Sequence, residues 1–432
     1  MASAALLLFG AFGLLTAIGV PIAFAIGAAA AITFLLFMDF NQSVFIVAQQ
    51  MASGLDSFTL LAIPFFILAG NIMNRGGIAM RLIAFAKVLG GRLPGALAHC
   101  NVLANMMFGS ISGSAVAAAA AVGGVMSPLQ KKEGYDPAYS AAVNIASCPT
   151  GLLIPPSATL IVYSLITGGT SIAALFVAGY LPGLLMGLSL MIVAGIIAKK
   201  RGYPLAPRST WQEVFRATAD AILPLGLIVI VMGGIISGAF TATEASAIAV
   251  VYTLLLALVW YREIGVKDLP SIITESAVTT SIVLLMIGAS IAMSRAMAFG
   301  DIPFALSDAL LSISENPIVI LLAINIALLI VGTFMDMTPA LLIFTPIFMP
   351  VVRDLGMDPV HFGIVMTFNL CIGICTPPVG SALFVGCSVG GTSISAVIRP
   401  LLPFYAVLFA LLLLVTYVPA ISLTLPRLLL GY

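Results

Sequence analysis

The sequence predicts an all-α, polytopic membrane protein with two inverted repeats, each containing a re-entrant helical hairpin and a broken helix. Composition gives the first reason, because 61% of the residues are hydrophobic and 8% are charged, against about 25% charged in soluble domains. The second reason is a series of apolar runs of about 20 residues, the length that one bilayer crossing needs. The third reason is a Pro-Pro motif that occurs twice, beginning at Pro155 and at Pro377.

The duplication extends well beyond these prolines. Residues 126–172 match residues 348–394 at 13 of 47 positions without a gap, at a constant offset of 222. The identities include glycines, prolines and an aspartate, which shared apolar composition does not bring into register. We therefore interpret the chain as an internal duplication, with a first repeat at 1–210 and a second repeat at 211–432.

The apolar runs of the first half lack the two-residue alternation of barrel strands, so helices are expected. The Gly-Ser-rich segment 109–114 joins two limbs that are each short for a crossing, which predicts the tip of a re-entrant hairpin. The predicted elements are two passes or one broken pair within 3–37, a pass at 57–73, a basic amphipathic segment at 76–90, a hairpin at 93–128 with limbs 93–108 and 115–128, a helix at 138–166 broken at Pro155-Pro156, and a pass at 172–198.

The second half follows the same plan. Its hairpin tip, at 332–338, contains an acidic residue, Asp336. The predicted elements are passes at 219–238, 244–261 and 275–297, a hairpin at 317–350 with limbs 317–331 and 339–350, a helix at 359–389 broken at Pro377-Pro378, and a last pass at 396–420.

Charge predicts the orientation of the chain. With the loop at 131–133 in the cytoplasm, Arg295, Arg353 and Arg427 lie outside, and the other 14 of the 17 Lys and Arg residues lie inside. This is a strong positive-inside bias. Because a hairpin returns to its own side, each half makes an odd number of crossings, so the second half is predicted to be inverted.

Several function classes are disfavoured. The net charge of +1 and the absence of a long Lys/Arg block give no indication of nucleic-acid binding. No phosphate-binding loop, His-Glu-x-x-His or paired Cys-x-x-Cys spacing is present in the sequence, so we expect neither an enzyme nor a resident cofactor. The five cysteines lie in apolar segments and are expected to be packing residues.

Helices broken inside a membrane leave carbonyls and amides that need partners. Such carbonyls can bind Na⁺, and exposed helix N-termini attract carboxylates. The alternative for each Pro-Pro is a packing kink, and for the Gly-Ser tip it is close helix packing. Two copies in register favour the functional interpretation, and the whole pattern is typical of a secondary transporter.

Individual acids and histidines are weighed in the same way. Asp336 at membrane depth is the most informative candidate, since ionisable groups there are usually functional; the alternative is a cap for the next limb, where Pro339 follows. Glu244 has capping-box spacing from Thr241. Asp136 and Asp358 are expected to be cap or loop residues, and His99 and His361 to be satisfied by packing.

Four motifs in order resemble the large membrane (M) subunit of the tripartite ATP-independent periplasmic (TRAP) transporters, over nearly the whole chain. The sequence departs from the family at Ala118, near which many members carry an acid. The motifs are Phe108-Gly109-Ser110-Ile111-Ser112-Gly113-Ser114-Ala115-Val116-Ala117, Gly134-Tyr135-Asp136-Pro137, Ile154-Pro155-Pro156-Ser157 and Gly238-Ala239-Phe240-Thr241-Ala242-Thr243-Glu244-Ala245.

The resemblance implies a Na⁺-coupled importer of an organic acid, such as sialic acid or a C4-dicarboxylate, in the bacterial inner membrane. It implies an elevator-type fold like that of the ion-transporter superfamily, in which 93–171 and 316–394 move and the remainder is scaffold. It also implies two partners, a small four-helix membrane subunit and a periplasmic substrate-binding protein. The alternative is a stand-alone Na⁺-coupled dicarboxylate or citrate symporter; a channel and a membrane enzyme are further rivals.

Carried over by position, the resemblance also implies site residues. The tips and breaks would hold Na⁺ through carbonyls as much as through side chains. The substrate would lie between the tips, where Asp336 would not bind a carboxylate directly because like charges repel. The implied Na⁺ residues are Ser110, Ser112, Gly113, Thr150, Gly151, Ile154, Gly332, Thr333, Met335, Gly373, Thr376 and Pro377, and the implied substrate residues are Ser112, Ser157 and Asp336.

Overall fold

The computed structural model describes residues 2–90, 94–203, 210–305, 308, 314 and 316–432, and every regular element among them is helical. Position 93, where the first hairpin was predicted to begin, lies outside these residues. Eight helices within the described part are long and apolar enough to cross a membrane, or nine if one bent pair is counted as a span. The predicted all-α, multi-pass fold is therefore confirmed.

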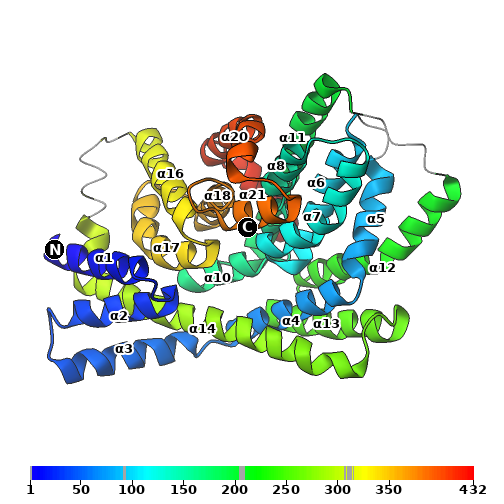
Figure 1. The fold of residues 1–432 in the computed structure, drawn as a ribbon. Coiled ribbons are helices and arrows are strands. Elements are labelled where there is room, and N and C mark those ends of the chain that lie inside the picture. Colours follow the sequence, from blue (N-terminus) through cyan, green and yellow to red (C-terminus); the bar gives the residue numbers. More distant parts are fainter. Residues whose placement is uncertain (1, 91–93, 204–209, 306–307, 309–313, 315) are drawn as a thin grey trace.

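The helices form two packed groups, and one helix, α5, packs against both. The first, which we call the scaffold group, is organised around one long helix, α14, that packs against α2, α3 and α4 and runs along the bottom of Figure 1. The group contains α1 (Ala2–Ala17), α2 (Ile22–Phe34), α3 (Phe40–Leu55), η1 (Phe58–Leu61), α4 (Ala62–Arg75), α5 (Ile78–Gly90), α12 (Trp211–Ile236), α13 (Ala242–Leu254), η2 (Leu255–Trp260), η3 (Val266–Asp268) and α14 (Leu269–Phe299).

The second group, which we call the hairpin group, contains both hairpins and both broken helices. The long helices α11 and α20 pack within it, so this unit extends beyond the predicted moving segments 93–171 and 316–394. Its members are α6 (Ala96–Ser112), α7 (Ala115–Lys132), α8 (Pro137–Ser147), α9 (Thr150–Leu153), α10 (Ala158–Ile166), α11 (Ile172–Arg201), α16 (Pro317–Phe334), α17 (Met337–Asp354), α18 (Pro359–Gly373), α19 (Ser381–Gly390), α20 (Ile394–Tyr417) and α21 (Ala420–Leu430).

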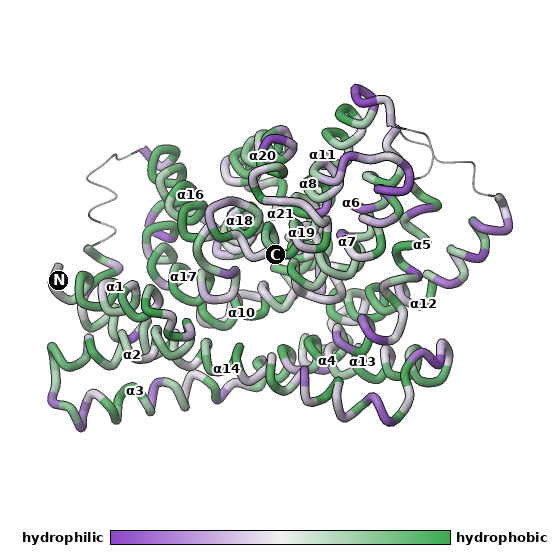
Figure 2. Tube along the Cα trace, in the orientation of Figure 1, coloured by the Kyte–Doolittle hydropathy of each residue, from purple (hydrophilic) through white to green (hydrophobic). Residues whose placement is uncertain are grey.

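The hydrophilic residues gather where the chain turns. Figure 2 shows apolar colour along most helices and polar colour at the C-terminal end of α11 and the N-terminal end of α12. These ends carry Lys199, Lys200 and Arg201 before the connector and Arg216 after it. A surface arranged in this way suits helices that are surrounded by lipid and turn in the basic interfacial layer.

The hairpin tips are shorter than the sequence suggested. The first tip was predicted at 109–114, but α6 continues to Ser112, so only Gly113 and Ser114 link the limbs. Gly113 has φ +63°, which glycine adopts without strain, and the Ser114 hydroxyl caps α7 by accepting from the Ala117 amide at 3.2 Å. The second tip is likewise reduced from 332–338 to Met335 and Asp336.

Both Pro-Pro motifs interrupt a helix, as predicted. Between α8–α9 and α10 the chain bends by 52°, and α18 ends at Gly373 before α19 begins at Ser381. The Pro155-Pro156 and Pro377-Pro378 peptide bonds are both cis. A proline supplies no amide to the helix ladder, and this explains the location of the breaks.

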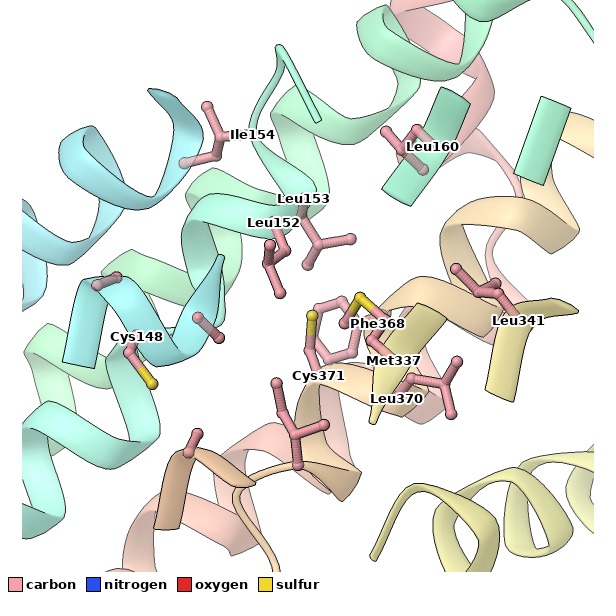
Figure 3. Close-up of a cluster of buried hydrophobic side chains, with 14 of the residues drawn as sticks. Cys148, Leu152, Leu153, Ile154, Leu160, Met337, Leu341, Phe368, Leu370 and Cys371 are labelled. Carbon is pink, nitrogen blue, oxygen red and sulfur yellow. The ribbon is translucent and has the colours of Figure 1, made fainter. Parts of the chain in front are cut away.

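The helix after each break packs on the second hairpin limb of the other half. The post-break helix α10 packs on α17 of the other half, and α19 packs on α7. The helices that lead into the two breaks also touch, since α9 packs on α18 and the Cys375 thiol at the second break lies 2.9 Å from the Ile145 carbonyl of α8. Figure 3 shows Leu152 and Leu153 of one break pointing toward Phe368 and Cys371 beside the other.

Buried amides tie each hairpin to the broken helix that follows it. The Asn105 Nδ2 on α6 donates to the Asn144 Oδ1 on α8 at 3.0 Å, and the Asn369 Nδ2 on α18 donates to the Asn325 Oδ1 on α16 at 3.0 Å. All four side chains are at most 2% exposed. A buried amide that loses its partner is costly, so these pairs fix how limb and broken helix dock.

Other local predictions were also tested. Thr241 and Glu244 form a capping box at the start of α13, and Asp136 and Asp358 cap α8 and α18. The rings of His99 and His361 bond to the carbonyls of Pro94 and Thr416, and the five cysteines are free and buried. Helices α3 and α21 were not predicted.

Glycines allow each tip to touch its break. A Cβ on Gly151 of α9 would overlap the backbone of Gly109 and Ser110 on α6, and a Cβ on Gly373 would lie 2.6 Å from the Gly332 Cα. The contacts are therefore backbone against backbone in both halves. Gly151 and Gly373 are identical positions of the repeat, so the duplication preserves this close approach.

We expect Gly151→Ala to lower the thermal unfolding midpoint of the detergent-purified protein, because overpacking against a rigid backbone costs about 1–3 kcal/mol. Gly124→Ala is the matched control, since a Cβ there meets nothing within 4 Å and alanine favours a helix interior by up to about 1 kcal/mol. Equal midpoints for the two variants would contradict the close contact.

Candidate functional site

A cavity of about 340 Å³ lies where the two hairpin tips meet the scaffold group. Tip residues Ser112 and Gly113 line it from one side and Asp336 from the other, with Pro156 and Ile374 from the two broken helices. The opposite wall comes from α4 and α14. The scaffold residues on that wall are Ile63, Phe66, Ile67, Gly70, Asn71, Asn74, Thr279 and Val283.

The first tip and break bring hydroxyls and helix ends together. Ser110 is buried and its Oγ donates to the Met107 carbonyl at 2.9 Å, while the Thr150 Oγ1 donates to the Ser147 carbonyl at 2.6 Å. Gly151 contacts Gly109, and Ile154 ends α9 in an extended conformation with ψ 121°. Five of the predicted Na⁺ residues, Ser110, Ser112, Gly113, Thr150 and Gly151, thus belong to one tip-and-break junction.

The second junction has the same construction. Gly332 touches Gly373, and the carbonyl of Thr333 accepts from the Gly380 amide at 3.1 Å. The Thr376 Oγ1 donates to the Ile372 carbonyl at 2.7 Å. Met335 ends α16 in an extended conformation, and Pro377 is half-buried in the break.

Asp336 is not held as a helix cap. It occupies the N-cap position of α17, but its side chain makes no capping bond there. Its Oδ1 instead accepts from the Ser381 hydroxyl of α19 at 3.1 Å. The carboxylate is exposed on the cavity wall, so the cap interpretation of this residue is not supported.

Ser157 lies differently from the other two predicted substrate residues. Its side chain is fully buried, its hydroxyl has no hydrogen-bond partner among the described residues, and it does not line the cavity. Its neighbours Pro156, Ala158 and Thr159 line the cavity instead.

The scaffold wall of the cavity was not predicted. Asn71 on α4 is positioned by donating from Nδ2 to the Ser276 hydroxyl on α14 at 2.8 Å, and the nearby Arg75–Glu275 ion pair joins the same helices at 2.7 Å. Asparagine at 71 and 74, one turn apart near the end of an apolar pass, was the available signal.

A multi-pass helical protein whose two hairpin tips and two broken helices share one cavity belongs to the class of membrane transport proteins. Residues 9–421 match the family described as "Tripartite ATP-independent periplasmic transporter, DctM component". The chain belongs to this family, as its large permease subunit. Membership implies a small membrane subunit and a periplasmic binding protein as partners.

Three relatives are similar along nearly their whole length. The chain is 58% identical to "Uncharacterized protein YgiK" of Salmonella typhimurium, covering 98% of this chain and 97% of the relative. It is 41% identical to the sialic acid TRAP transporter large permease protein SiaM of Vibrio cholerae, covering 98% and 99%. It is 42% identical to the C4-dicarboxylate TRAP transporter large permease protein DctM of Pseudomonas aeruginosa, covering 93% of each.

The fold is also similar to a solved transporter structure, that of Alcanivorax borkumensis YdaH. The TM-score is 0.62 at 13% identity, covering 88% of each chain. At this identity the likeness concerns the fold alone.

Asp336→Ala is expected to abolish transport in proteoliposomes while the purified protein keeps its unfolding midpoint, because the exposed carboxylate supports no helix cap. Asp354→Ala, at the exposed far end of α17, is the matched control and should transport normally. Wild-type transport by the Asp336 variant would return this residue to a structural role.

Proposed function

We propose that this protein is the large permease subunit of a Na⁺-coupled TRAP transporter in a bacterial inner membrane, importing an organic acid of the sialic acid or C4-dicarboxylate class. A periplasmic binding protein would deliver the acid, and a small four-helix subunit would complete the membrane part. The observation that carries the proposal is the single cavity shared by both tips, both breaks and the scaffold wall. The family match favours this function over a stand-alone symporter.

The tip-and-break junctions have the chemistry that Na⁺ needs. The hydroxyl groups of Ser110, Thr150 and Thr376 donate hydrogen bonds to carbonyls, and each hydroxyl oxygen keeps lone pairs that can face a cation. Hard cations such as Na⁺ prefer such oxygen ligands together with backbone carbonyls. Among the described residues no cluster of three or more His, Cys, Asp or Glu side chains could hold a metal, so the proposed sites use neutral oxygens.

The acidic group of the substrate would meet helix N-termini. The first turn of α7, from Ser114 to Ala117, lines the cavity, and so do Met337 and Thr338 in the first turn of α17. Both helices are 18 residues long and direct the positive ends of their dipoles at the cavity. Asp336 beside them would bind a hydroxyl or amide of the substrate, because a second carboxylate would be repelled.

Movement would occur at the boundary between the two groups. The tip cavity is bounded on one side by the hairpin group and on the other by α4 and α14. Sliding the hairpin group along α14 would carry the cavity from one membrane face to the other, which is the elevator motion. Within the hairpin group the exchanged packing of α7 with α19 and of α10 with α17 favours movement as one unit.

We expect accumulation of labelled sialic acid or succinate by proteoliposomes that contain both membrane subunits and the binding protein to require an inward Na⁺ gradient. Without the gradient, the internal concentration of the acid should not rise above the external one, because a coupling ion at equal concentration supplies no driving force. Vesicles with an inward K⁺ gradient are the control. Accumulation that persists after the Na⁺ gradient is collapsed would contradict the proposed coupling.

A further inference from the structure

A second cavity of about 340 Å³ lies farther along α14, on the same boundary between the two groups. Its walls are Gln50 of α3, Leu165 and Ile166 at the end of α10, Leu342 of α17, and residues of α14. The α14 residues are Ser290, Ile291, Ser294, Arg295 and Ala298. The function proposed above assigns no role to this cavity.

The two cavities lie one after the other along the same face of α14. Thr279 and Val283 line the tip cavity, and Ser290 and Ser294 line the second. Spacings of four, seven and four residues place all four on one side of α14. Ser290 follows Thr279 by 11 residues, which is about 16 Å along a helix rising about 1.5 Å per residue.

The second cavity is lined by polar side chains, one of which is buried without a hydrogen-bond partner among the described residues. Ser290 is 3% exposed, and its hydroxyl has no hydrogen-bond partner among the described residues. A buried hydroxyl without a partner is unfavourable, and on the wall of a cavity this hydroxyl is placed to donate to a ligand. Ser294, one turn farther, is half-buried on the same wall.

Arg295 supplies a positive charge at this site. The three ion pairs among the described residues involve Arg75, Arg81 and Arg201, and none involves Arg295. Its guanidinium lies 5.1 Å from the centroid of the Phe299 ring, and this ring packs edge-on against Phe34 at 5.6 Å. The ring therefore orients the arginine, and among the described residues no hydrogen bond or ion pair occupies its guanidinium donors, which suits them to an anion.

We propose that Ser290, Ser294 and Arg295 form a second anion-binding subsite, which receives the acidic group of the substrate before it enters the tip cavity. The inference rests on the proposed function. The distribution of Lys and Arg predicts that this end of α14 faces outward, which is the side from which an importer takes its substrate. A hairpin group displaced outward along α14 would bring its tips level with this subsite.

Thiol labelling of the detergent-purified complex tests the subsite without transport. Ser294→Cys is reacted with an anionic sulfonate and with a cationic trimethylammonium methanethiosulfonate, and the wild-type chain with its five buried cysteines gives the background. The ratio of anionic to cationic rate should fall about fivefold when Arg295→Gln is added, since a nearby charge raises the local concentration of its counter-ion. Arg295→Lys should preserve the ratio.

Arg353→Gln is the matched control for charge, because Arg353 is an exposed arginine that lines neither cavity. Added to the Ser294→Cys variant, it should leave the labelling ratio unchanged. Succinate or sialic acid should slow the labelling of the introduced thiol. A ratio that Arg295→Gln leaves unaltered, or labelling that neither acid slows, would overturn the subsite.

Uptake kinetics supply the second readout. In proteoliposomes Arg295→Gln should raise the KM for succinate or sialic acid about tenfold and leave the maximal rate and the Na⁺ requirement within about twofold, because the charge acts on capture. Arg353→Gln should match the wild type. An unchanged KM for the Arg295 variant would contradict the subsite. Na⁺-independent uptake by the wild type would instead contradict the proposed function, and the labelling ratio would then decide whether the subsite exists.

Discussion

The structure depends on backbone contact between each hairpin tip and the broken helix beside it. Gly109 meets Gly151 in the first half, and Gly332 meets Gly373 in the second, and no side chain fits between the two backbones. This approach packs the end of each first limb on the helix that leads into the break, so that the interrupted backbone nearby, which would be costly in lipid, is covered by protein. Burying both segments inside protein makes non-helical backbone possible at membrane depth, and it makes a site there as well.

The hairpin group also has features that favour a rigid unit. Buried Asn pairs dock the first limb of each hairpin on its broken helix, and the helix after each break packs on the second limb of the other half. The scaffold group offers α14, whose one face presents Thr279, Val283, Ser290 and Ser294 in a row. A rigid unit that faces one continuous helix is the arrangement that the proposed sliding movement would need.

The hairpins, the breaks and the tip residues could be predicted from the sequence because they depend on local constraints. Paired prolines stop a helix wherever they occur, and the duplication provided a second copy for comparison. The hydrogen-bonded Asn pairs could not be found in the same way, because their members do not align between the repeats. Asn105 and Asn325 are 220 residues apart and Asn144 and Asn369 are 225 apart, whereas the repeat offset is 222. These contacts recur in space in both halves without being aligned in sequence.

Other features were not predicted for a different physical reason. Helix α3 is too polar to stand out as an apolar run, with Asn41, Gln42, Gln49 and Gln50 among its 16 residues. The scaffold wall of the cavity is formed where α4, with Asn71, packs against α14, with Thr279. These two helices are about 200 residues apart in the chain. Ser157 was predicted to bind the substrate because it follows the first Pro-Pro motif, but its side chain is buried in the protein interior. Its neighbours on either side in the chain line the cavity.

We propose that the tips and breaks move as one body past α14. Pulsed electron paramagnetic resonance tests it with two pairs of spin labels at exposed positions, Lys132 with Lys267 between the groups and Lys132 with Arg399 within the hairpin group. Movement as one body predicts two distances between Lys132 and Lys267, whose populations shift when Na⁺ and substrate are added. The distance between Lys132 and Arg399 should not change. A single fixed distance between the groups, or a within-group distance that changes together with it, would contradict the account.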